Sequence, residues 1–178
     1  MLARVAALCT LLALAGPVLA ADTTWDRNAA WLREQIKACA DTKDEVECRR
    51  FAARALKQLF AIDDYCKSEH CMQSQNMAAQ LGKDGRWSAL GKGDEQTALT
   101  RAQEMATGGM PVIAVHSSGA SGVIAIVMPG KLVPAHSWHR NVPVSVGTRL
   151  DKPEGSVYGK GLNFLFKDPT KVRLYAYK

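Results

Sequence analysis

The sequence lacks three patterns that would each indicate a function class. After residue 20 it has no apolar run of the roughly 20 residues that a membrane-spanning helix needs. It has no cluster of lysines and arginines with interleaved aromatic residues, the usual signature of a nucleic-acid interface. Its cysteines do not follow the paired C-x-x-C spacing of structural zinc sites. We therefore expect no transmembrane segment, no nucleic-acid partner, no metal and no cofactor.

The first twenty residues have the pattern of a cleavable secretory signal. Arg4 gives a short basic start, residues 5–16 are almost purely apolar, and residues 18–20 read VLA, a small-residue cleavage pattern. This predicts a signal peptide over residues 1–20 and a periplasmic or secreted protein. Arg4 is the only charged residue in that stretch, so 22 basic and 17 acidic residues remain, a net charge of +5. Such a mild surplus suits an anionic envelope polymer, and it equally suits ordinary solubility.

Four cysteines follow the predicted signal peptide: Cys39, Cys48, Cys66 and Cys71. An even number in an exported chain fits two disulfides, and four cysteines allow three pairings. Cys39 and Cys48 lie on the apolar faces of two predicted helices joined by a short loop, so we expect a Cys39–Cys48 bond. Cys71 is then either bonded to Cys66 or free.

Apolar periodicity predicts an α+β fold, with N-terminal helices packed on a small antiparallel β-sheet. We expect a helical hairpin over residues 21–65 and an α+β domain over residues 66–178. Further helices are expected at residues 71–82, opening at Cys71, and from residue 94 or 95 to 107, with a loop at 83–93 between them. Strands are expected at residues 112–116, 123–128, 142–146 and 171–177.

Three features between residues 66 and 178 carry a resemblance to a known family. A cysteine, Cys71, opens a helix that ends in Leu81-Gly82; a VIAV strand at 112–115 is followed by a glycine-flanked turn; and residues 122–130 read GVIAIVMPG. In this order the features resemble papain-like cell-wall amidases and endopeptidases of the NlpC and CHAP type. The resemblance implies a papain-like fold and a peptidoglycan-peptide substrate.

The resemblance also implies where a cysteine hydrolase would hold its catalytic groups. Cys71 takes the position of the nucleophile, and Val123 takes the position of the usual histidine. Valine cannot accept a proton, so the usual dyad is absent. If residues 112–116 and 123–128 form a symmetric hairpin, His116 lies directly opposite Val123 and on the same face, which makes it the candidate replacement base.

The segment LVPAHSWHR at residues 132–140 borders the substrate groove in the resembled family. His136 is a candidate catalytic or orienting residue there, and Trp138 and His139 are candidate binding residues. The alternative is a surface loop with Trp138 packed against the sheet.

Three functions follow from these residues. The first is a catalytically degenerate module that binds peptidoglycan or an envelope protein. The second is an active cysteine amidase or endopeptidase with Cys71 as nucleophile and His116 as base. The third is an accessory or immunity-like partner of a secreted effector. The oligomeric state is not predicted by the sequence.

Overall fold

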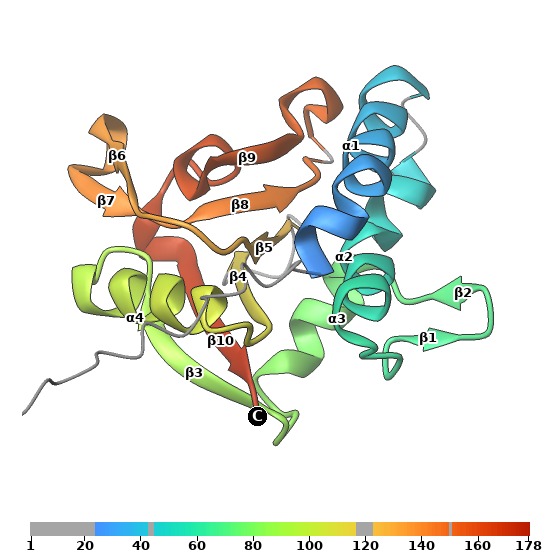
Figure 1. Cartoon of the computed structure of the whole chain (residues 1–178), viewed down its shortest axis with the longest axis horizontal. Helices are drawn as coiled ribbons and strands as arrows, with labels where there is room; N and C mark the ends of the chain where they lie inside the picture. The colour runs from blue at the N-terminus through green and yellow to red at the C-terminus, as the bar shows by residue number, and fades with distance from the viewer. Residues whose placement is uncertain (1–23, 43–44, 117–122, 150) are drawn as a thin grey trace, which may run out of the picture.

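The protein has the predicted α+β architecture, in which helices come first and a mostly antiparallel sheet follows (Figure 1). The structure is a computed structural model that describes residues 24–42, 45–116, 123–149 and 151–178. The expected signal peptide at residues 1–20 lies outside the described residues. The helices of the described part are α1 (Thr24–Thr42), α2 (Glu45–Phe60), α3 (Ser74–Leu81) and α4 (Gln96–Thr107).

Six strands form one antiparallel sheet in the order β3–β10–β4–β5–β8–β9. Their bounds are β3 (Trp87–Lys92), β4 (Val112–His116), β5 (Ile124–Val127), β8 (Val144–Gly147), β9 (Val157–Gly161) and β10 (Val172–Tyr177). Two short ribbons stand outside it: β1 (Cys66–Lys67) with β2 (His70–Cys71), and β6 (Val133–Ala135) with β7 (Arg140–Val142). Short 3-10 turns are η1 (His136–Trp138), η2 (Pro153–Gly155), η3 (Leu162–Phe164) and η4 (Pro169–Lys171).

The sheet separates two hydrophobic cores, because successive strand residues point to opposite faces. One core joins the sheet to α1, α2 and α3, and the other joins it to α4 and the segment around η3; Figure 1 shows the helices divided in this way. The first core contains Ile113, Ile124 and Ile126, and the second contains Ala114, Ala125 and Leu174. Burial of a side chain such as Phe51 or Leu99, both fully buried, contributes about 1.5–3 kcal/mol each.

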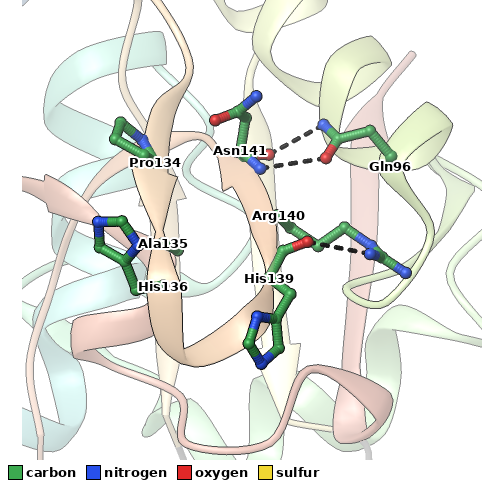
Figure 2. A pocket seen from close by; sticks show the side chains of 7 residues that line it. All are labelled: Gln96, Pro134, Ala135, His136, His139, Arg140 and Asn141. Carbon is green, nitrogen blue, oxygen red and sulfur yellow. Dashed lines mark hydrogen bonds between the residues drawn. The ribbon is translucent and has the colours of Figure 1, made fainter.

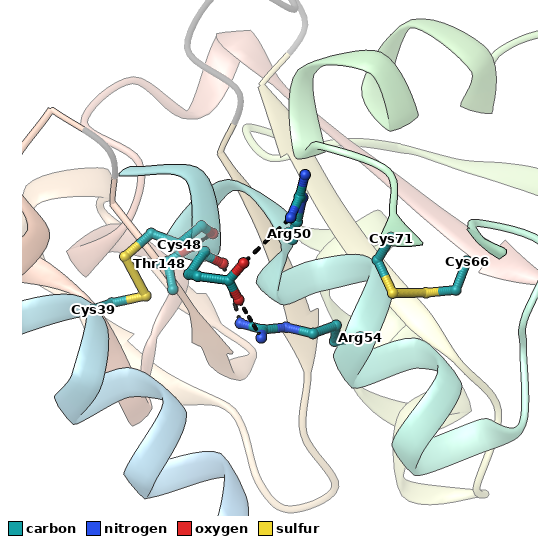
Figure 3. A network of polar contacts seen from close by, with 8 residues as sticks. Cys39, Cys48, Arg50, Arg54, Cys66, Cys71 and Thr148 are labelled. Atoms are coloured by element: carbon teal, nitrogen blue, oxygen red, sulfur yellow. Dashed lines mark hydrogen bonds and ion pairs between the residues drawn. A yellow bond between two sulfur atoms is a disulfide. The ribbon is translucent and has the colours of Figure 1, made fainter. Parts of the chain in front are cut away.

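One disulfide joins the two helices of the N-terminal hairpin, and a hydrogen bond near it joins the hairpin to the sheet. Cys39 of α1 and Cys48 of α2 are bonded, with their Cα atoms 5.3 Å apart, as the two helix faces predict. The buried hydroxyl of Thr148 donates a hydrogen bond to the carbonyl oxygen of Cys48 at 2.9 Å, which ties the start of α2 to the end of β8. Figure 3 shows this disulfide and the Cys66–Cys71 disulfide, with Arg50 and Arg54 of α2 drawn between them.

The predicted loop at residues 83–93 is wrong in part, because Trp87–Lys92 forms the edge strand β3. Gly91 and Lys92 have low strand propensity, and the strand forms through its pairing with β10. The pairing register shifts between Leu174 and Tyr175, opposite Gly91, whose φ of 136° lies in the region that favours glycine.

Two observations bear on the compartment of the protein. Among the described residues, none of the helices combines the length and apolar character of a membrane-spanning segment. The two disulfides fit an oxidising location outside the cytoplasm, where such bonds persist.

Candidate functional site

Cys71 is bonded to Cys66 and does not begin a helix. The two residues lie opposite each other in the β1–β2 ribbon, with their Cα atoms 4.0 Å apart. Helix α3 begins at Ser74, with Gln73 as its N-cap in extended conformation. The prediction that Cys71 opens this helix is therefore wrong, because the disulfide holds Cys71 in an extended ribbon. In this structure Cys71 has neither a free thiol nor a place in a first helical turn, the two features that favour a reactive thiolate.

His116 lies directly opposite Val123, as the symmetric hairpin predicts. Ile113 pairs with Ile126 and each later residue of β4 continues the register, and the His116 N–H donates to the Val123 carbonyl oxygen at 3.4 Å. Val123 itself is buried, with 6% of its surface exposed. The position that the resemblance assigns to a catalytic histidine is thus a core residue.

The sheet separates His116 from Cys71. Residues directly opposed in an antiparallel pair point to the same face, so His116 and Val123 share the face of Ala114 and Ala125, which α4 covers. Cys71 packs against the core on the other face, with α2 and α3. The structure therefore does not bring the candidate nucleophile and the candidate base together.

The carboxylate of Asp168 is an acidic group that interacts electrostatically with His116. Hydrogen bonds from the hydroxyl and the N–H of Thr170, at 2.7 and 3.0 Å, lower the pKa of this carboxyl, and the charges of Lys171 and His116 lower it further. Asp168 precedes β10, the strand that pairs with β4. The carboxylate of Asp168 therefore interacts electrostatically with His116.

The three aromatic candidates of the LVPAHSWHR segment lie in the turn of the β6–β7 hairpin. Trp138 is buried, and its indole Nε1 donates to the carbonyl oxygen of Phe166 at 3.1 Å. Trp138 therefore anchors the turn to the segment that contains Phe166. His136 and His139 are exposed, and His139 has a left-handed backbone with φ 51° and ψ 40°. That conformation is uncommon for a residue with a side chain, although histidine adopts it more readily than most.

Two residues hold the hairpin to the start of α4. The side-chain amide of Gln96 donates to the Asn141 carbonyl oxygen at 2.9 Å and accepts from the Asn141 N–H at 3.1 Å. Arg140 donates from Nε to the Asp94 carbonyl oxygen at 3.3 Å and from Nη1 to the His139 carbonyl oxygen at 3.0 Å. These bonds fix the backbone of β7 relative to α4.

An open pocket of about 360 Å³ lies between the hairpin and the start of α4. Figure 2 shows the imidazole ring of His136 on one side of the hairpin, beside Pro134, the side chains of Gln96 and Arg140 on the other side, toward α4, and the ring of His139 nearer the turn. The lining residues are Gln96, Pro134, Ala135, His136, His139, Arg140 and Asn141. They supply N–H donors and no carboxylate, so the pocket is suited to an electron-rich ligand.

A second hollow lies on the outer face of α3, on the side of the molecule that holds Cys71. It is lined by Met72, Asn76, Ala79, Gln80, Lys83, Asp84 and Arg86. Under it, Trp87 Nε1 donates to the Tyr65 hydroxyl at 2.7 Å, and this hydroxyl donates to Asp84 Oδ2 at 3.0 Å. Hydrogen bonds from Arg86 lower the pKa of Asp84 to about 2, and burial raises the pKa of Tyr65. The network joins the residue before β1 to β3, and we assign it a structural role.

The sequence predicts the two histidines of the β6–β7 pocket as candidate residues but does not indicate the residues that frame the pocket. Gln96, Arg140 and Asn141 are ordinary surface residue types, and Gln96 is 45 positions from Asn141. No local sequence signal connects them. The only sequence indication of this site was the density of histidine and tryptophan in residues 132–140.

Comparison with models of known protein families gives no match, and neither does comparison with curated proteins. Within the described ranges there is no group of three or more His, Cys, Asp or Glu side chains arranged to hold a metal ion.

Proposed function

We propose that the protein is an exported envelope module that binds peptidoglycan or an envelope protein and does not use Cys71 as a nucleophile. The observation that carries this proposal is the state of Cys71: its sulfur is bonded to Cys66, and the sheet lies between it and His116. Thiol catalysis needs a thiolate within hydrogen-bond reach of its base. The degenerate papain-like amidase fold, the signal peptide and the periplasmic or secreted location are parts of the same proposal.

The binding surface in this proposal is the β6–β7 hairpin with the start of α4. It supplies a concave site whose volume lies in the range of small-ligand pockets, about 300–1,000 Å³. Its frame is held by the Gln96 and Arg140 hydrogen bonds and by buried Trp138. A site that is rigid before binding loses less conformational entropy on binding. The net positive charge of the chain also favours the anionic polymers of the envelope.

The test is co-sedimentation of the purified, unreduced protein with peptidoglycan sacculi, combined with an assay for new amino groups. We expect the protein to sediment with the sacculi and to release no amino groups. A Cys66→Ala/Cys71→Ala variant should bind equally well, and Cys39→Ala/Cys48→Ala is the matched control for loss of a disulfide. Release of amino groups that is lost in the Cys71→Ala protein would refute the proposal and establish the amidase.

A protein partner in place of peptidoglycan gives a different result in the same experiment. The protein then stays in the supernatant with purified sacculi, and an excess of sacculi does not compete for the partner captured from an envelope extract. If neither material binds, the envelope-binding proposal fails.

A further inference from the structure

We propose that the β6–β7 pocket binds the carboxylate group of a peptide, with Arg140 as the charged contact and the neighbouring His139 as an additional donor. The inference rests on the proposed binding role and names the ligand class of that site. Three observations support it: the hydrogen-bond donors that line the pocket, the N–H groups of these donors that make no bond, and the contacts that hold the donors in place.

The donor set is one-sided. Among the lining residues, Arg140 carries a permanent positive charge, and each imidazole offers at least one N–H in either protonation state. Asp94 and Glu95, the acidic residues directly before Gln96 in the sequence, do not line the pocket. The Glu95 carboxylate accepts a hydrogen bond from the backbone N–H of Lys92. An anionic group entering the pocket therefore meets donors and no facing carboxylate.

The donors have capacity left. Arg140 uses Nε and Nη1 for the carbonyl oxygens of Asp94 and His139, so three of the five guanidinium N–H groups have no bond within the described part of the chain. Both imidazoles are exposed, and neither forms a hydrogen bond with another residue of the described part of the chain. These two hydrogen bonds fix the orientation of the Arg140 guanidinium and leave Nη2 available to a ligand oxygen. A planar guanidinium matches a carboxylate, with which it can form two parallel hydrogen bonds.

The turn holds His139 in a conformation that local preferences disfavour. Its left-handed backbone is maintained by the hydrogen bond of its N–H to the His136 carbonyl oxygen at 3.2 Å and by burial of the neighbouring Trp138. Strain of this kind in a fixed frame is frequent at ligand sites. Pro134 and Ala135 form the apolar side of the same pocket, where the methyl or methylene groups of a peptide can pack.

A peptide end fits these features better than inorganic phosphate does. The pocket offers one permanent charge and an apolar wall, whereas phosphate sites commonly present several cations or a row of backbone N–H groups. Peptidoglycan stem peptides and protein C-termini both end in a carboxylate. The chemistry of the pocket is the same for both sources.

The experiment follows backbone amide resonances of the full mature protein during titration with two peptides. The probes are acetyl-Ala-Ala with a free carboxylate and the same peptide with a C-terminal amide. We expect the acid to shift the amides of residues 134–141 with a saturable Kd, and the amide to bind at least ten-fold more weakly. Arg140→Gln should weaken binding of the acid at least ten-fold. Arg101→Gln, which removes an exposed arginine on α4 and changes the net charge equally, should leave the Kd unchanged.

Three results would overturn the inference. Equal binding of the acid and the amide would exclude carboxylate recognition. An equal loss in Arg101→Gln and Arg140→Gln would reduce the effect to net charge. Tighter binding of inorganic phosphate than of the acid at the same amides would assign the pocket to phosphate. Saturable binding of the acid by a protein that binds neither sacculi nor envelope protein would uphold the pocket and reject the proposed function.

Discussion

Removal of the Cys66–Cys71 disulfide should lower the free energy of unfolding by about 2 kcal/mol, and removal of Cys39–Cys48 should lower it by about 3 kcal/mol. The two bonds join residues 5 and 9 positions apart. The entropy that a cross-link removes from the unfolded chain grows with the logarithm of the number of residues in the closed loop, about 6 and 10 when both cysteines are counted, which gives about 2.2 and about 2.7 kcal/mol at 25 °C. The buried Cys39 and Cys48 side chains, 3% and 1% exposed, add a small packing loss when truncated to alanine.

The measurement is urea unfolding of the two double-alanine variants and the oxidised wild type at pH 7. For a chain of this size, each kcal/mol corresponds to about 2–4 °C in Tm. In thermal unfolding, the Tm of the variant without Cys66–Cys71 should therefore be roughly 4–8 °C lower than that of the wild type. The Cys66→Ala/Cys71→Ala protein should retain a cooperative transition. An unchanged midpoint for that variant would refute the reasoning, since it would mean that the bond does not constrain the unfolded chain. A larger loss for it than for the other pair would show that packing of the ribbon, and not loop length, sets the effect.

Three further predictions concern the frame of the site and the network under α3. Gly93→Ala should cost about 1–3 kcal/mol in urea unfolding, because its Cβ would lie 2.8 Å from the Pro169 carbonyl oxygen, while Gly85→Ala, which meets nothing within 4 Å, should be neutral. Trp138→Phe should cost about 1–3 kcal/mol by leaving a buried carbonyl without its donor, and an unchanged midpoint would contradict that. The folded-state pKa of Asp84, about 2 against an ordinary 3.8, means that its stabilisation is present above pH 4 and is lost as the pH falls toward 2. Wild type and Asp84→Asn should therefore differ by about 1–2 kcal/mol at pH 6 and converge near pH 2, and a difference independent of pH would exclude this ionisation as the cause.

The parts of the fold that the sequence predicts correctly depend on local patterns. The apolar stripes that include Leu32 and Ala52 identify α1 and α2, and the apolar runs at 112–116 and 123–128 identify β4 and β5. The His116–Val123 register follows from a symmetric hairpin. The Cys39–Cys48 pairing follows from two helix faces separated by a short loop. Each inference needs only residues close together in the chain.

The parts that the sequence does not predict depend on contacts between distant segments. Residues 87–92 become a strand because β10 pairs with them, and α3 starts at Ser74 because the Cys66–Cys71 bond holds the preceding residues extended. The separation of Cys71 from His116 follows from which helices cover which face of the sheet. The frame of the β6–β7 pocket depends on the hydrogen bonds between Gln96 and Asn141, which only the folded chain brings together.

The state of the Cys71 sulfur in the native, unreduced protein tests the central claim most directly. The protein would be alkylated under native and denaturing conditions without reductant, and the peptides mapped by mass spectrometry. We expect no labelled cysteine after residue 20 in either condition and two linked peptide pairs, Cys39 with Cys48 and Cys66 with Cys71. Rapid labelling of Cys71 in the native protein would contradict the account, because it would reveal an accessible thiol where the structure has a disulfide.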